Sequence, residues 1–136
     1  MAKNIRTLTV IGVIIAVSAT LIYYTQLQSP KIDYGDVTVE QAKELIEKKS
    51  SLVLLDVRTD WEFDSGHIEG AINMPVDDLQ QRHAELKPND EILVYCRTGN
   101  RSAKAMQILK DNGYSKVYNM EGGIEAWKKA GYPIVK

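Results

Sequence analysis

The sequence predicts an α/β sandwich, in which helices cover both faces of a parallel sheet. Short aliphatic runs alternate along the chain with segments of helical periodicity, which is the pattern of parallel β-α units. Two of these runs, residues 51–57 and 91–95, are apolar almost throughout, as expected for strands that are buried on both faces. The chain has 136 residues, of which 44% are hydrophobic and 26% charged, and this composition suits one globular domain.

The N-terminal region differs from the rest, because no charged side chain lies between Arg6 and Lys31. As a helix rising 1.5 Å per residue, the apolar run 8–24 would cover most of a ~30 Å hydrocarbon core. Lys3 and Arg6 precede this run, so the positive-inside rule places the N-terminus in the cytoplasm. We therefore expect residues 1–31 to form a membrane anchor or export signal followed by a linker.

Two forms of this segment are open. In a signal peptide, residues 8–16 would be the apolar core and Val17-Ser18-Ala19 a cleavage site, leaving a periplasmic or secreted domain. The apolar run continues past this site to Tyr24, which favours an uncleaved single-pass anchor that contacts the membrane through residues 7–24. Either form places residues 32–136, the expected folded domain, outside the cytoplasmic membrane.

The first part of this domain carries clear boundary signals. Thr38 and Gln41 have the spacing of a capping box, so the first helix is expected to begin after Thr38. The apolar run 51–57 follows as a buried strand. A short helix should come next, with Thr59 as its N-cap and Gly66 closing it.

The second part continues the alternation of strands and helices. The expected elements are a short strand at 70–75, a helix at 76–86, a strand at 91–95, a helix at 101–112, a strand at 116–120 and a helix at 122–131. In such sheets, functional sites lie at the carboxyl ends of the strands. Cys96 stands at one of these ends.

Composition excludes several classes of function. The single cysteine cannot form an internal disulfide, and with only His67 and His83 it cannot supply a structural zinc site, so we expect no metal. All 18 acidic residues follow Lys31, whereas Lys3, Arg6 and Lys31 are among the 17 basic ones. The domain is therefore acidic, and nothing in its charge points to nucleic acid.

The stretch "ILVYCRTGNRS", residues 92–102, predicts a reactive cysteine. Cys96 leaves a strand, and the amides of a short loop and of a following helix N-terminus form an anion cradle that would lower the thiol pKa. A buried, inert cysteine is the alternative, but inert cysteines lie within apolar runs. The candidate substrate-binding residues are the loop arginines Arg97 and Arg101, the hydroxyls of Thr98 and Ser102, and the turn-forming Gly99 and Asn100.

The spacing within this loop separates two kinds of chemistry. Protein tyrosine phosphatases have five residues between the cysteine and the arginine of their loop. Here four residues separate Cys96 from Arg101, and the next position is Ser102, which cannot clamp a phosphate bidentately. The smaller loop suits one additional sulfur atom on Cys96, so a phosphatase or arsenate reductase is disfavoured.

Three stretches in order resemble the signatures of single-domain rhodaneses: "LLDVRTDWEFDSGHIEGAINMP" at 54–75, "YCRTGNRSAKA" at 95–105 and "GGIEAWKKAGYP" at 122–133. The resemblance implies a three-layer sandwich around a five-stranded parallel sheet. It also implies ping-pong sulfur transfer from a donor such as thiosulfate to cyanide or a thiol, through a persulfide on Cys96 and without a cofactor. A protein thiol is a further sulfur acceptor that the resemblance implies.

Competing interpretations apply to the whole chain and to single residues. The chain could be a persulfide carrier that docks on a partner and does not turn over by itself. Asp56 and Arg58 could form part of the pocket rim, although we favour a salt-bridge set that includes Glu62. For His67, a hydrogen bond that fixes a turn is expected rather than a role as general base.

Overall fold

The computed structural model describes residues 2–27 and 31–136, and its contacts divide the chain into the units Met1–Lys31 and Ile32–Lys136. In the first unit, helix α1 (Ala2–Leu27) contains the stretch Thr7–Leu27, which is long and apolar enough to cross a membrane. A signal sequence has the same length and composition, so the helix is consistent with both expected forms of this segment.

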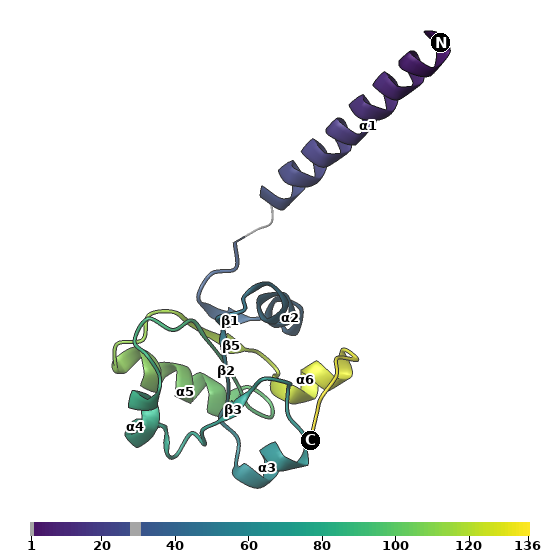
Figure 1. Cartoon of the computed structure of the whole chain (residues 1–136). Coiled ribbons are helices and arrows are strands. Elements are labelled where there is room, and N and C mark those ends of the chain that lie inside the picture. Colours follow the sequence, from purple (N-terminus) through teal and green to yellow (C-terminus); the bar gives the residue numbers. More distant parts are fainter. Residues whose placement is uncertain (1, 28–30) are drawn as a thin grey trace. The chain divides into compact units, whose positions relative to one another are not determined.

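The second unit is built on a five-stranded sheet in the order β1-β5-β4-β2-β3, and every pair of neighbouring strands is parallel (Figure 1). The strands are β1 (Gly35–Val37), β2 (Val53–Asp56), β3 (Ile72–Asn73), β4 (Ile92–Tyr95) and β5 (Val117–Met120). This confirms the five-stranded parallel sheet and the α/β sandwich. The strand that carries Cys96 at its end, β4, is central in the sheet.

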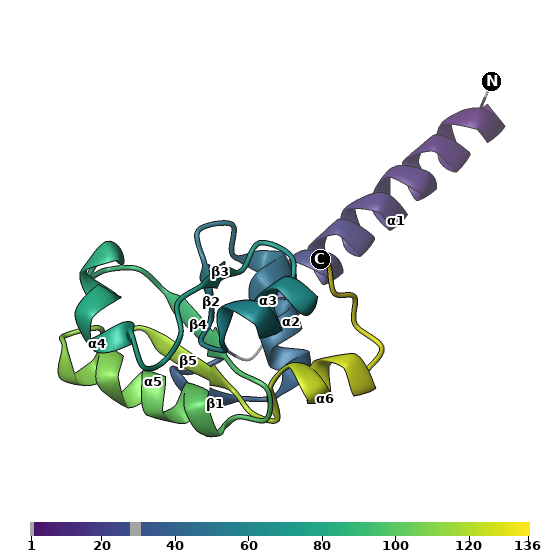
Figure 2. The same ribbon diagram turned by 90° about the horizontal axis from the view of Figure 1, so that it is seen from below.

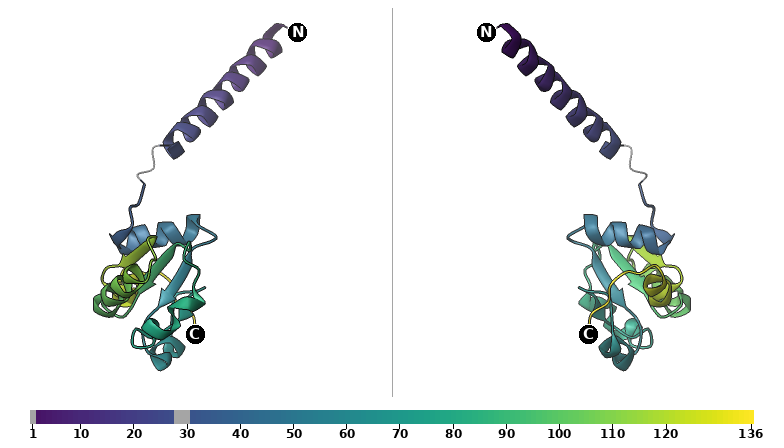
Figure 3. Two further views of the ribbon diagram at one scale, coloured as in Figure 1. Left: turned by 90° about the vertical axis from the view of Figure 1, so that its left-hand side faces the viewer. Right: turned by 90° about the vertical axis from the view of Figure 1, so that its right-hand side faces the viewer.

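Helices cover both faces of the sheet, and the figures show the two layers on opposite sides (Figures 1 and 3). Leu54 and Leu93 join a core with residues of α2 (Val39–Lys48) and α6 (Gly123–Lys129). Their neighbours Leu55 and Val94 belong to the opposite core, beneath α4 (Leu79–Arg82) and α5 (Asn100–Asp111). Successive side chains of a strand point to opposite faces of the sheet, and here both faces are covered by helices. Neighbouring residues such as Leu54 and Leu55 are therefore both buried, which explains the continuous apolar runs.

Two elements differ from the expectations. Strand β1 was not recognised in the sequence, because it has three residues and only Val37 is buried. The helix expected at 76–86 is a four-residue helix, α4, followed by one 3-10 turn, η1 (His83–Glu85). The Tyr114 hydroxyl lies 2.6 Å from the His83 carbonyl oxygen and 3.0 Å from that of Leu86, so it can donate its one proton to a carbonyl at the end of this short turn.

The remaining helix, α3 (Asp60–Ser65), begins shortly after the carboxyl end of β2 (Figure 2). Thr59 is its N-cap and Gly66 its C-cap, as the sequence predicts. The segment after α3 is fixed by the C-terminal tail, because His67 and Val135 exchange two backbone hydrogen bonds of 2.8 Å. The His67 ring nitrogen Nδ1 also lies 2.9 Å from the Phe63 carbonyl oxygen, which confirms the expected turn-fixing hydrogen bond. Helix α3 is thus held beside the carboxyl edge of the sheet.

Candidate active site

The candidate site lies at the carboxyl edge of the sheet, where the chain leaves two adjacent central strands. Cys96 directly follows β4, and Asp56, the last residue of β2, pairs in register with Tyr95 of β4. Helix α5 begins at Asn100, one residue earlier than the sequence indicated, so the loop is short. A strand, a tight loop and a helix therefore follow one another, which is the arrangement that an anion cradle requires.

The sulfur of Cys96 lies inside this loop and is almost fully buried. The backbone amide of Gly99 donates a hydrogen bond of 3.1 Å to Sγ. Burial opposes ionisation of the thiol, but the Ser102 hydroxyl and the amides of Ser102, Gly99 and Thr98 favour the thiolate, outweigh burial and lower the pKa of Cys96. The loop therefore stabilises negative charge on this sulfur.

Ser102 has a position that suits a movable donor. Its side chain is fully buried, and its hydroxyl lies 3.1 Å from the Gly99 carbonyl oxygen. A hydroxyl has a single proton and rotates freely about its C–O bond. It can therefore donate to the Gly99 carbonyl beside a neutral thiol and to the sulfur once Cys96 is ionised.

The start of α6 closes the loop from the other side. The amides of Ile124 and Glu125 donate to the carbonyls of Cys96 and Arg97 at 2.8 and 3.1 Å. Gly123 has φ +59°, and a methyl group on its Cα would overlap the Cys96 carbonyl oxygen and the Arg97 backbone. Sequence reasoning did not assign this role to Gly123, although the glycine pair in "GGIEAW" was a visible signal for a close backbone approach.

The two loop arginines have different surroundings. Arg97 is exposed and forms no side-chain hydrogen bond or ion pair with the described residues. Arg101 forms a bidentate ion pair with Glu62, with Nη1 at 2.7 Å from Oε2 and Nη2 at 2.9 Å from Oε1. The guanidinium of Arg101 is the main cause that lowers the pKa of Glu62 to about 2, and the carboxylate in turn raises the pKa of Arg101.

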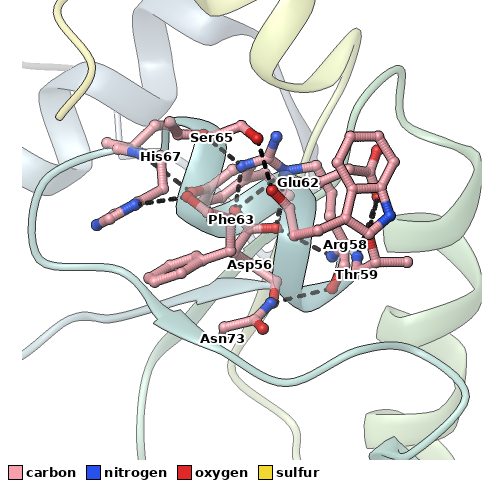
Figure 4. A network of polar contacts seen from close by, with 12 residues as sticks. Asp56, Arg58, Thr59, Glu62, Phe63, Ser65, His67 and Asn73 are labelled. Carbon is pink, nitrogen blue, oxygen red and sulfur yellow. Dashed lines mark hydrogen bonds and ion pairs between the residues drawn. The ribbon is translucent and has the colours of Figure 1, made fainter. Parts of the chain in front are cut away.

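Asp56 and Arg58 form a second, more deeply buried pair (Figure 4). Arg58 donates from Nε and Nη2 to the Asp56 carboxylate at 3.0 and 2.7 Å, and Nη2 also lies 2.7 Å from the Gly66 carbonyl oxygen. Desolvation opposes the charge of Arg58, but the contacts with Asp56 raise its pKa. The salt bridge of Arg58 is therefore with Asp56, whereas Glu62 pairs with Arg101.

Hollows flank the loop on two sides. One, of about 280 Å³, is lined by Arg58, Trp61, Glu62, Ser65, Arg97 and Glu125, so Arg58 also reaches a rim. Trp61 is 70% exposed there. The other, of about 260 Å³, includes Thr98, Gly99 and Asn100 in its lining. Among residues 2–27 and 31–136 no group of three or more His, Cys, Asp or Glu could hold a metal ion.

Comparisons with known proteins match the part of the chain that contains most of the sheet and the Cys96 loop. The family model of the rhodanese-like domain matches residues 38–130. The putative sulfur carrier protein YrkF of Bacillus subtilis is 35% identical over 92 residues, which make up 68% of this chain but 50% of YrkF. The thiosulfate sulfurtransferase GlpE of Tolumonas auensis is 33% identical over 97 residues, or 71% of this chain and 90% of that protein.

A solved structure shows the same fold. The crystal structure of a rhodanese-related protein from Thermoplasma volcanium superimposes with a TM-score of 0.68 at 33% sequence identity. The match covers 75% of this chain and 98% of that structure. The folded unit thus has relatives in solved structures, whereas the chain spans only about half the length of YrkF.

Proposed function

The chain belongs to the rhodanese-like domain family, and we propose that it moves sulfane sulfur from a donor such as thiosulfate to a thiophilic acceptor through a persulfide on Cys96. The hydrogen bond of 3.1 Å from the Gly99 amide to the Cys96 sulfur carries this proposal. It belongs to a set of donors that favours the thiolate, which is the nucleophilic form of cysteine.

The first half-reaction loads the sulfur. The Cys96 thiolate attacks the outer sulfur of thiosulfate, a new S–S bond forms, and the bond to the central sulfur breaks as sulfite leaves with its electron pair. One thiolate and one thiosulfate dianion thus give one ionised persulfide and one sulfite dianion. The loop amides of Thr98, Gly99 and Ser102 that favour the thiolate would also stabilise the terminal sulfur of the persulfide.

The second half-reaction returns the thiolate. Cyanide, or the sulfur of an acceptor thiol, attacks the terminal sulfur, and Cys96 leaves as the thiolate. With cyanide the product is thiocyanate, and with a thiol it is the acceptor persulfide. Neither half-reaction consumes an oxidant or a reductant, so this chemistry requires no cofactor.

The test is intact mass spectrometry of the full chain, purified in mild detergent, after incubation with thiosulfate. We expect the wild-type chain to gain one sulfur atom and the Cys96→Ser variant to gain none, with one sulfite released for each chain loaded. Added cyanide or thiol should then remove the sulfur and permit repeated turnover. Loading without turnover would identify a carrier instead, and failure of wild type to load would refute the assignment.

We also propose that α1 anchors the chain in the cytoplasmic membrane, with residues 32–136 on the outer side. Support comes from the apolar stretch Thr7–Leu27 and from Lys3 and Arg6 before it. Proteolysis of intact cells freed of their outer envelope should digest the domain, and the chain should sediment with membranes. Recovery of a soluble domain that lacks the N-terminal residues would show a cleaved signal instead.

A further inference from the structure

Glu62 connects helix α3 to the Cys96 loop, although the two segments lie far apart in the sequence. Both oxygens of its carboxylate bind the two terminal nitrogens of Arg101, at 2.7 and 2.9 Å. Such a fork-to-fork pair fixes the plane of a guanidinium as well as its distance. A carboxylate thus determines where the second loop arginine points.

The carboxylate is itself fixed by the first turn of α3 (Figure 4). Glu62 Oε2 accepts hydrogen bonds from the Thr59 amide and the Thr59 hydroxyl, at 3.0 and 2.9 Å. The Glu62 side chain is 13% exposed, while that of Arg101 is 35% exposed. The Glu62 carboxylate is therefore fixed by its bonds to Thr59. It in turn holds the longer and more exposed side chain of Arg101 in place.

The fixed guanidinium lies within electrostatic reach of the nucleophile. Arg101 follows Asn100 in the first turn of α5, at the end of the loop. After its hydrogen bonds with Glu62, the negative charge of an ionised Cys96 also favours the charged form of Arg101. With its two terminal nitrogens committed to Glu62, Arg101 is poorly placed to follow a substrate, but it can act as a stationary counter-charge.

Arg97 has the complementary character. Its side chain is exposed, lines the hollow of about 280 Å³, and is not bonded to any residue in the described part of the chain. A free guanidinium can turn toward an incoming anion and leave with it. The two arginines, which the sequence presents as one anion clamp, therefore differ in freedom.

We infer that Glu62 is a positioning residue, which holds Arg101 as a fixed counter-charge for the Cys96 sulfur and leaves capture of the anionic donor to Arg97. This inference rests on the proposed function for its kinetic consequences. It predicts that Glu62 acts on the reaction through Arg101 alone, whereas a residue that only stabilises α3 would act independently of Arg101.

A double-mutant cycle on the full chain in detergent tests this prediction, with thiosulfate as donor and cyanide as acceptor. Arg101→Ala should lower kcat on the order of 100-fold, as loss of one preorganised charge-stabilising group does. Glu62→Ala should cause a similar loss, yet only roughly 3-fold more when Arg101 is already alanine. Arg97→Ala should instead raise KM about 10-fold with little change in kcat. Additive losses from Glu62→Ala and Arg101→Ala would overturn the inference.

Two further variants control for charge and folding. Asp60→Asn removes a carboxylate from the same helix, but no hydrogen bond or ion pair joins Asp60 to Arg101 in the structure, so its effect should simply add to that of Arg101→Ala. If Glu62→Ala does not fold, Glu62→Gln keeps the shape and one acceptor oxygen. It should lose part of the activity, and most of that loss should likewise be absent in the Arg101→Ala background.

The pH dependence of Cys96 alkylation by iodoacetamide separates this inference from the proposed function. Arg101→Ala should raise the thiol pKa, and Glu62→Ala should shift it in the same direction because Arg101 becomes mobile. Removal of a nearby negative charge alone would lower the thiol pKa. A downward shift in Glu62→Ala would therefore overturn the inference, even if the wild-type chain transferred no sulfur.

Discussion

Helices α2 and α3 begin with the same local motif but differ in what the motif is connected to. At the start of α2, Thr38 N donates to Gln41 Oε1 at 2.9 Å, and Gln41 N donates to Thr38 Oγ1 at 3.3 Å. At the start of α3, the carboxylate of Glu62 accepts from the amide and hydroxyl of Thr59. The glutamate then continues across space to Arg101, while the glutamine of α2 stops at its own helix.

The difference shows how a helix cap acquires a second role. A neutral glutamine satisfies one free amide of the first turn, which is a local contribution to stability. A glutamate in the same position adds a charge that is favourable at a helix N-terminus and is available to a distant cation. In α3 this cation is Arg101, in the first turn of the helix that follows the Cys96 loop, so the cap joins the stability of α3 to the geometry around Cys96.

Reversing the charge at Glu62 should give the largest difference in unfolding free energy between the two helix starts. Glu62→Lys places an ammonium against Arg101 and against the free amides of α3, so the free energy of unfolding should fall by about 3 kcal/mol. The matched change Gln41→Lys loses a cap acceptor at a site without a distant partner, and it should cost within about 1 kcal/mol. Urea unfolding of both full-length variants measures the difference. Equal losses would show that the Arg101 contact contributes nothing beyond the cap.

A smaller change in unfolding free energy is expected when the negative charge is only removed at Glu62 or only added at Gln41. The pKa of Glu62 is about 2 in the folded chain, below its ordinary value of 4.5. The stabilisation from this depressed pKa is therefore fully present above pH 4.5 and is lost as the pH falls toward 2. Glu62→Gln should cost about 1–3 kcal/mol at neutral pH, the range for hydrogen bonds to charged groups.

The matched variant for this test is Gln41→Glu. It adds a carboxylate at the start of α2, where the helix dipole should reward it by about 0.3–1 kcal/mol at neutral pH. Unfolding free energies measured between pH 7 and pH 2.5 should show the Glu62→Gln deficit shrinking steadily with acid. A deficit that stays constant would mean that the ionised carboxylate is not what stabilises α3.

The sequence was informative about the helix caps and about the place of Cys96 at a strand end, but not about long-range pairing. Thr38, Thr59 and Cys96 were all recognisable, because a cap or a strand end is determined by residues within a few positions. The partner of Glu62 lies in another segment, and local charge spacing favoured Arg58 instead. Only the packing of α3 beside the loop brings Arg101 within bonding distance.

Similar limits explain what else the sequence did not show. The three-residue β1 exists because it pairs with β5, and its own residues carry no strand pattern. The role of Gly123 follows from the approach of α6 to the Cys96 carbonyl, which is again a contact between distant segments. Periodicity can predict elements, but the contacts between elements decide which of two equivalent arginines is free.

The smallest expected effect comes from the cap hydroxyls. Thr38→Ala removes the acceptor for the Gln41 amide and should cost about 1 kcal/mol, the usual value for an N-cap. The Thr59 hydroxyl instead donates to a carboxylate that Arg101 and the Thr59 amide already hold, so Thr59→Ala should cost less, about 0.5 kcal/mol. Thermal unfolding of the two variants beside wild type compares the caps directly, and the rate of sulfur loading should stay at the wild-type value in Thr38→Ala. If Thr59→Ala proved the more damaging of the two, the hydroxyl rather than the ion pair would be the principal anchor of Glu62. The start of α3 would then be held mainly by its own cap, and the ion pair with Arg101 would contribute less than the cap does.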